Sequence, residues 1–130
     1  MAEKVKVLEV TVPEAIGAGA PVLRALADAK INIVAFCGFT MGPEATLTFV
    51  VEPGKEAAAK TALKKPAGKV TAYDAVLVAA GNKPGAMAGL TEKLAAAKVN
   101  IKWAYATTAG KNAAIVFVVD SAAKAVKAFK

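Results

Sequence analysis

The stretch GNKPGAM, residues 81–87, decides how this chain is interpreted. It follows an apolar, strand-like run at 75–80 and opens a segment in which Met87, Leu90 and Leu94 recur at helical spacing. A proline suits the first helical position, because its fixed φ matches the helix and its missing N–H is not needed there. The neighbouring glycine has no Cβ, so a ligand or another chain can approach the backbone closely. The stretch therefore predicts a bare helix N-terminus whose amides suit a carboxylate.

The same pattern occurs twice in the chain. Shifting the N-terminal half forward by about 68 positions overlays it on the C-terminal half without gaps, a period typical of domain duplication rather than of short solenoid repeats. Alanine-rich segments can align with each other by chance. Asparagine, glycine and phenylalanine residues that match in one fixed register are much harder to obtain from composition alone. The matched pairs include Gly17 with Gly85, Asn32 with Asn100, Gly42 with Gly110, and Phe49 with Phe117. We therefore expect two units, residues 1–73 and 74–130.

Periodicity and turn residues predict the elements of each unit. Strands are expected at 5–12, 31–39, 46–51, 69–73, 75–80, 99–107 and 113–119, and helices at 18–29, 55–65, 85–97 and 121–129. The first unit reads βαββαβ, and the second lacks its last strand. This order is typical of the ferredoxin-like arrangement, an α+β fold in which two helices cover one face of an antiparallel sheet. The missing strand would leave the first strand of the second unit at a sheet edge, which a partner subunit could cover.

Composition excludes several classes of protein. The net charge of +7 comes almost entirely from lysines spread along the predicted helices and turns, with a single arginine. Sequence-specific nucleic-acid binding relies on arginine forks and stacking aromatics, so the charge indicates a solubilising surface. No apolar run approaches the roughly 18 residues of a membrane span, and the N-terminus lacks a signal-peptide layout. We expect a cytoplasmic protein without membrane or specific nucleic-acid partners.

The residues needed for common catalytic chemistry are missing. The chain has no histidine and one cysteine, and no cysteine or carboxylate spacing is typical of a metal or acid–base site. The glycines match neither a P-loop nor a dinucleotide fingerprint. The sequence therefore predicts a protein that is not an enzyme and carries no catalytic residues, no metal and no cofactor.

The order of elements and several motifs resemble the ACT domain. The motifs are NKPGAM after the first strand of the second unit, VNI opening its second strand, a glycine turn, and AIVFVVD in its third strand. The whole chain resembles a small stand-alone protein made of two tandem ACT domains. The resemblance implies a regulatory module that binds a small ligand, most often an amino acid, where two ACT units meet.

The resemblance also implies where the ligand is held. The ligand loop falls on Asn82, Lys83, Pro84, Gly85, Ala86 and Met87, and the start of the second strand on Asn100 and Ile101. The counterparts in the first unit are Ala15, Ile16 and Gly17, followed by Asn32 and Ile33.

Some of these residues have plainer explanations. Asn32 and Asn100 each follow a helix end and could simply satisfy backbone groups at a turn. Gly85 could be needed only for its backbone conformation, and Met87 could belong to the core. In the first unit an acidic residue, Glu14, stands where Asn82 is found, and Ile16 replaces the proline. One good carboxylate site, in the second unit, is therefore expected rather than two equal ones.

These inferences lead to one main hypothesis and its rivals. The main hypothesis is an amino-acid-binding regulatory or sensor protein, a homodimer, with the ligand at the interface between ACT units. The alternative is an interaction module without a small ligand, which docks a metabolic enzyme through a sheet edge or through the surface of Trp103 and Tyr105. A small enzyme of the ferredoxin-like class is a weaker third possibility, because fold alone implies no activity.

Overall fold

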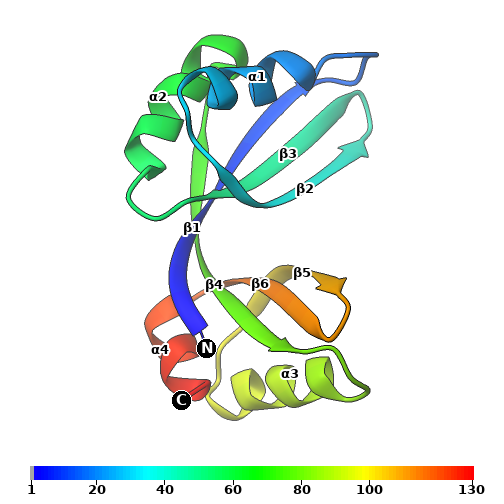
Figure 1. Ribbon diagram of the computed structural model, residues 1–130, viewed down its shortest axis with the longest axis vertical. Helices are drawn as coiled ribbons and strands as arrows, with labels where there is room; N and C mark the ends of the chain where they lie inside the picture. The colour runs from blue at the N-terminus through cyan, green and yellow to red at the C-terminus, as the bar shows by residue number, and fades with distance from the viewer. Residues whose placement is uncertain (1) are drawn as a thin grey trace. The chain divides into compact units, whose positions relative to one another are not determined.

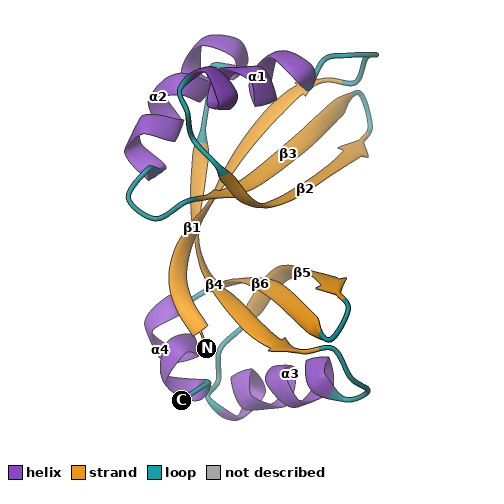
Figure 2. Cartoon of the chain, viewed as in Figure 1, coloured by secondary structure: helices purple, strands orange, loops and turns teal. Residues whose placement is uncertain are grey.

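The computed structural model describes residues 2–130, which form six strands and four helices (Figures 1 and 2). In chain order these are β1 (Ala2–Pro13), α1 (Ala20–Asp28), β2 (Ile33–Met41), β3 (Glu44–Val51), α2 (Glu56–Ala67), β4 (Thr71–Gly81), α3 (Ala86–Ala96), β5 (Ile101–Ala109), β6 (Asn112–Val119) and α4 (Ala122–Ala128). The strands predicted at 69–73 and 75–80 are one continuous strand, β4. The order of elements otherwise follows the predicted duplication.

Residues Val7–Tyr73 form the N-terminal unit. In this unit β3 pairs antiparallel with both β1 and β2, and the first residues of β4 lie beside β1. Helices α1 and α2 cover one face of the sheet (Figure 2). On that face Leu8 lies opposite Phe49, and both pack with Leu26 of α1 and Leu63 of α2 in a fully buried core.

Residues Asp74–Lys130 form the C-terminal unit, together with residues 2–6 of β1. Its central strand β6 pairs antiparallel with β4 and β5, and places Phe117 opposite Val76. These two side chains pack with Leu94 of α3 in a second apolar core. Each repeat therefore forms an antiparallel sheet with its own core beneath two helices, as the ferredoxin-like arrangement requires.

Strand β1 completes the sheet of the C-terminal unit. No strand follows α4 among residues 2–130, as predicted, and residues 2–6 of β1 lie beside β4 instead. Ala2 packs against the C-terminal core, and the Lys6 ammonium donates a hydrogen bond to the Asp74 carboxylate. This hydrogen bond holds the pKa of Asp74 below its usual range. The prediction that β4 has an open edge, which a partner subunit could cover, is therefore wrong. The predicted domain bounds, 1–73 and 74–130, divide the chain by sequence alone. In the structure residues 2–6 pack with the C-terminal unit instead.

The first helix of each repeat ends in a Schellman motif. The amide of Val99 donates to the carbonyl of Leu94 at 2.9 Å, and Lys98 between them has a left-handed backbone with φ 59°. In α1 the amide of Ile31 donates to the carbonyl of Leu26 at 3.0 Å, with Lys30 also at φ 59°. Glycine is usual at this position, because a side chain there costs about 1 kcal/mol. The motif turns the chain directly from helix into strand.

Replacing the left-handed lysine by glycine should stabilise the protein. We expect Lys98→Gly to raise the free energy of unfolding by about 0.5–1 kcal/mol, because it removes the strain of a side chain at positive φ. The matched control Lys93→Gly, inside α3, should lower the free energy of unfolding by about 1 kcal/mol. Urea titration of both variants measures the two effects. If Lys98→Gly lowered the free energy of unfolding instead, the contacts of the Lys98 side chain would stabilise the protein by more than its left-handed backbone costs.

Removing residues 1–6 should destabilise the C-terminal unit selectively. The truncation removes backbone hydrogen bonds to β4 worth about 1 kcal/mol each, so we expect a loss of about 2–4 kcal/mol in that unit. Amide hydrogen exchange should accelerate at residues 75–80, with α1 and α2 less affected. Unchanged exchange at 75–80 would contradict the pairing of residues 2–6 with β4.

Candidate functional site

The loop between β4 and α3 is an exposed corner with a bare backbone. We call residues 82–87 the glycine corner. Gly85 is the N-cap of α3 and has a left-handed backbone with φ 85° and ψ −8°. A Cβ added at Gly85 would meet nothing within 4 Å, so the space beside it is open. The left-handed φ explains why glycine is found here, and the open space leaves the helix N-terminus accessible to a ligand.

Asn82 fastens the glycine corner to the turn between β5 and β6. Its backbone amide donates to the carbonyl of Lys111 at 2.8 Å, and its side-chain Nδ2 donates to the carbonyl of Gly110 at 3.0 Å. The side chain that was predicted to contact ligand therefore uses its amide group to hold the loop in place. Its Oδ1 atom remains an acceptor.

Two amides at the start of α3 are free to donate. The amide of Ala86 donates to the carbonyl of Lys83 at 3.2 Å, and that of Gly89 to Gly85 at 2.9 Å. Between them, the amides of Met87 and Ala88 have no hydrogen-bond partner within residues 2–130. Ala86, one of the residues expected to donate to a carboxylate, is thus already occupied. The side chain of Met87 is 39% exposed, so it lies at the rim of the corner rather than in the core.

The first repeat builds the same corner without a proline. The amide of Glu14 donates to the carbonyl of Pro43 at 2.9 Å, as Asn82 does to Lys111. Gly17 has φ 77°, and a Cβ added there would also meet nothing within 4 Å. Ala15, Ile16 and Gly17 are all exposed, and Ile16 projects fully into solvent. The two corners differ in charge and also in where the helix begins. The helix α3 starts directly after Gly85, whereas α1 starts at Ala20 behind a right-handed N-cap, Gly19.

Asn32 and Asn100 are each held by a carboxylate at the start of the second strand. The Asn100 amide donates to Oδ1 of Asp120 at 3.1 Å, and the Asp120 amide donates back to the Asn100 carbonyl at 3.2 Å. Glu52 makes the same pair of bonds with Asn32, at 3.2 Å and 3.1 Å. It is the asparagine backbone that these bonds satisfy. Neither asparagine side chain has a hydrogen-bond partner among the residues that the structure describes. The adjacent Ile33 and Ile101 pack at the edges of the two cores.

The structure does not bring the two parts of a candidate site together within one unit. Gly81 pairs with Asn112 at the start of β6, whereas Ile101 pairs with Val119 at its end. At about 3.4 Å per residue, the eight residues of β6 separate the glycine corner from Asn100 by about 24 Å. The same separation holds for Gly17 and Asn32 along β3. A small ligand that contacts both a corner and an asparagine therefore needs residues from two units.

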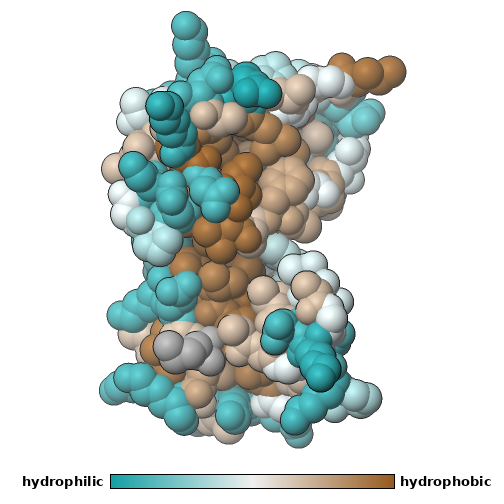
Figure 3. Space-filling view, viewed as in Figure 1, coloured by the Kyte–Doolittle hydropathy of each residue, from teal (hydrophilic) through white to brown (hydrophobic). Residues whose placement is uncertain are grey.

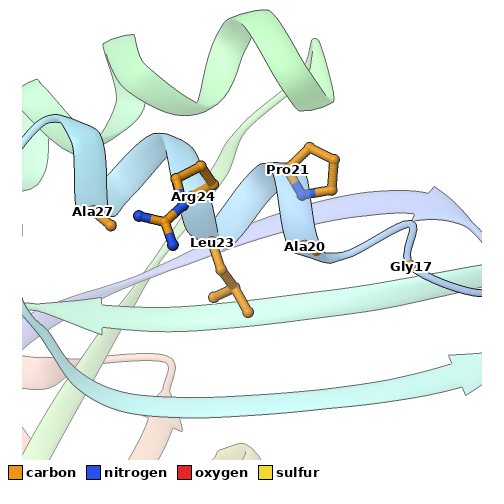
Figure 4. Close-up of a pocket in the computed structure, with 6 residues that line it drawn as sticks. All are labelled: Gly17, Ala20, Pro21, Leu23, Arg24 and Ala27. Carbon is orange, nitrogen blue, oxygen red and sulfur yellow. The ribbon is translucent and has the colours of Figure 1, made fainter.

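An open groove runs along α1 in the N-terminal unit. It has a volume of about 840 Å³ and is lined by Gly17, Ala20, Pro21, Leu23, Arg24 and Ala27 (Figure 4). Leu23 points from α1 towards the strands (Figure 4). Of the predicted site residues, Gly17 is the one that lines this groove. The sequence patterns did not single out this surface, although its small residues Gly17, Ala20 and Ala27 recur at helical spacing.

Solved structures are similar to this chain over almost its whole length. A protein from Bacteroides thetaiotaomicron is 26% identical, with a TM-score of 0.85 over 98% of this chain and 88% of its own. The regulatory subunit of aspartate kinase from Thermus thermophilus, in a ligand-free form, is 19% identical, with a TM-score of 0.75 over 98% of this chain and 92% of its own. The corresponding subunit from Thermus flavus is 17% identical, with a TM-score of 0.68 over 100% of this chain and 96% of its own. No protein-family model matches the chain, and no curated protein matches it significantly.

These similarities confirm the tandem ACT fold that the sequence resembles. The chain is built of two ACT-like units of ferredoxin-like topology, with no strand after α4 in the described part of the chain. Among residues 2–130, no helix is long and apolar enough to cross a membrane.

Proposed function

We propose that this protein is a non-catalytic regulator that binds an amino acid at a seam between two ACT units. The observation that carries the proposal is the glycine corner of the second repeat. It offers two unoccupied backbone amides, Met87 and Ala88, beside an open left-handed glycine. Structural similarity to regulatory subunits of aspartate kinase supports a regulatory role.

The chemistry of an amino acid fits the parts that the chain provides. The α-carboxylate would accept hydrogen bonds from the free amides at the start of α3, where the helix dipole favours negative charge. The α-ammonium needs acceptors, which the carbonyls or the side-chain oxygen of Asn100 or Asn32 of a second unit would provide. Asn32 and Asn100 have exposed side chains on rigidly held backbones, which suits this role.

The second repeat is the better carboxylate site of the two. Its corner is flanked by Lys83 and Lys111, whereas the corner of the first repeat is flanked by Glu14 and Glu44. Negative charge beside a helix N-terminus competes with a carboxylate ligand, and positive charge attracts one. We therefore assign the ligand to residues 82–87 and give residues 15–17 no equal role.

Ligand binding would act by ordering the seam between units. A ligand shifts an equilibrium only through its difference in affinity for two states, and a site made from two units binds only when they are together. The ligand would therefore strengthen the association of units in a homodimer, or change the affinity for a metabolic enzyme that this chain regulates.

The second candidate function is a docking module without a small ligand. It is favoured by the positions of β2 and β5, which end the strand order among residues 2–130 and therefore form the sheet edges there. In this case a metabolic enzyme would bind the sheet edge directly. The amino-acid screen described in the next paragraph separates the two functions.

An amino acid that binds should raise the melting temperature. At 100-fold over its dissociation constant a ligand adds about 2.7 kcal/mol, a shift of several degrees in a protein of this size. Screening the twenty amino acids by differential scanning fluorimetry tests this directly. No shift with any of them would favour the docking module.

A matched pair of glycine variants locates the site. Gly85→Asn places a side chain over the second corner while keeping a residue that tolerates positive φ, and Gly17→Asn does the same in the first repeat. We expect Gly85→Asn to abolish the thermal shift and Gly17→Asn to retain it. The reverse result would move the ligand to the first repeat.

A further inference from the structure

A second groove of the N-terminal unit lies between α1 and the C-terminal half of α2. It has a volume of about 400 Å³, and we call it the helix groove. Pro21 projects from α1 away from the strands, whereas Leu23 points towards them (Figure 4). The residues that line the helix groove include Pro21, Arg24 and Ala25 of α1 and Ala62, Lys65 and Pro66 of α2.

The helix groove combines apolar surface with positive charge. Ala25, Ala62 and Pro66 are half-buried, whereas Arg24 and Lys65 are exposed. Hydrophilic side chains project around the helices of this unit in the space-filling view, and apolar atoms reach the surface between them (Figure 3). A groove of this kind suits a partner that carries an acidic group beside an apolar one.

Arg24 is the only arginine of the chain, and its charged group is available. Its Nη1 atom lies 3.8 Å from Oδ1 of Asp28, which is longer than a hydrogen bond, and the side chain is 74% exposed. An ion pair this exposed contributes little to stability. The guanidinium has five N–H donors in a planar fork that matches a carboxylate. Arg24 can therefore bind an acidic group of another molecule.

Lysines surround the same end of the groove. Residues 55–69 contain five lysines and one acidic residue, Glu56. Lys64 and Lys65 lie in the last turn of α2, where the helix dipole favours positive charge. The dipole of α2 does not explain the arginine on α1. Together these residues give the groove a positive potential that attracts acidic partners.

A proline stands inside α2 at the groove. Pro66 has no N–H, so the carbonyl of Ala62 loses the donor that an α-helix normally provides. Both residues line the groove, and the helix nevertheless continues to Ala67. Local rules of this kind are typically broken at functional sites, where another gain offsets the cost.

The second repeat shows that the fold does not require the helix groove. At the positions equivalent to Pro21 and Arg24 it has Gly89 and Glu92, so the charge is reversed. Its second helix, α4, has seven residues against the twelve of α2, and lacks the turn that carries Lys65 and Pro66. The residues that give the groove its charge and its proline walls are therefore specific to the first repeat.

We propose that the helix groove binds an acidic segment of a partner protein. An Asp or Glu carboxylate of the partner pairs with Arg24 and Lys65, and a neighbouring apolar side chain packs against Pro21 and Pro66. A second copy of this chain would bring its own net charge of +7 to the same basic surface, so the partner is a different, acidic protein. Nucleic-acid phosphates would leave the apolar part of the groove unused.

The inference rests on the proposed role of this chain as a regulator of another protein. It deepens that role by naming the surface and the chemistry of the partner. It does not involve the glycine corner.

Two double variants with the same change in net charge test the groove. The groove variant is Arg24→Glu, Lys65→Glu, and it carries at position 24 the residue type that the second repeat has at Glu92. The control is Lys93→Glu, Lys124→Glu, which reverses two exposed lysines on α3 and α4. Circular dichroism and melting temperature check that each variant folds. The single variant Arg24→Gln removes one charge and keeps a good helix former if the groove variant unfolds.

Peptides selected from a phage-displayed random library serve as the probes. Peptides about twelve residues long are selected on the full chain and measured by fluorescence anisotropy, in about 150 mM salt to screen attraction to the net charge. We expect them to combine Asp or Glu with aromatic or aliphatic residues. Their dissociation constants should rise about tenfold or more with the groove variant and change less than about twofold with the control. Replacing the peptide acids by their amides should weaken binding to wild type and not to the groove variant.

Either of two results would overturn the inference. One is a library that yields no binding peptide, and the other is a set of peptides that bind the groove variant and the control equally well. Groove-dependent binding by a chain that no amino acid stabilises would instead count against the amino-acid proposal alone.

Discussion

The pairing of β1 with β4 is the interaction on which both units depend. Residues 2–6 of β1 lie beside β4 in the C-terminal unit, and the rest of β1 pairs with β3 in the N-terminal unit. The contiguous chain after Asp74 provides only three strands, and a sheet of that size with two helices is marginal alone. The Lys6–Asp74 ion pair lies where β1 and β4 pass from one unit to the other. Duplication thus produced two units that share strands rather than two independent domains.

Much of the fold could be predicted because the two repeats support each other. Helical spacing in 86–96 and the apolar run at 115–119 are local signals, and the match of Phe49 with Phe117 fixes their register. The continuity of β4 through Asp74 could not be predicted, because a charged residue between two apolar runs is typical of a turn. The pairing of residues 2–6 with β4 could not be predicted either. Alternation marks β1 as a strand but does not specify which neighbours it pairs with.

The sequence predicted where the chain leaves an open corner, but not the helix start or the hydrogen bonds of that corner. That these residues hold a ligand stays a prediction. The sequence predicted an open corner at Gly85, and the space beside Gly85 is open. It also predicted a proline at the first helical position, which is wrong, because Gly85 is a left-handed N-cap and α3 begins at Ala86. It did not predict that Asn82 fastens the corner to Gly110, since hydrogen bonds between distant turns leave no local pattern. The hydrogen bond between Asn100 and Asp120 could have been predicted, because Glu52 occupies the equivalent position in the first repeat.

Strand sharing sets an order of events during synthesis. The N-terminal unit is contiguous from Val7 to Tyr73, so it can fold as soon as the ribosome has released that segment. Residues 2–6 precede that unit in the chain, yet they find their place only when β4 and the other elements of the C-terminal unit have emerged. They are thus synthesised before the N-terminal unit and incorporated after it, so the nascent polypeptide carries an unpaired strand segment until the second unit is complete.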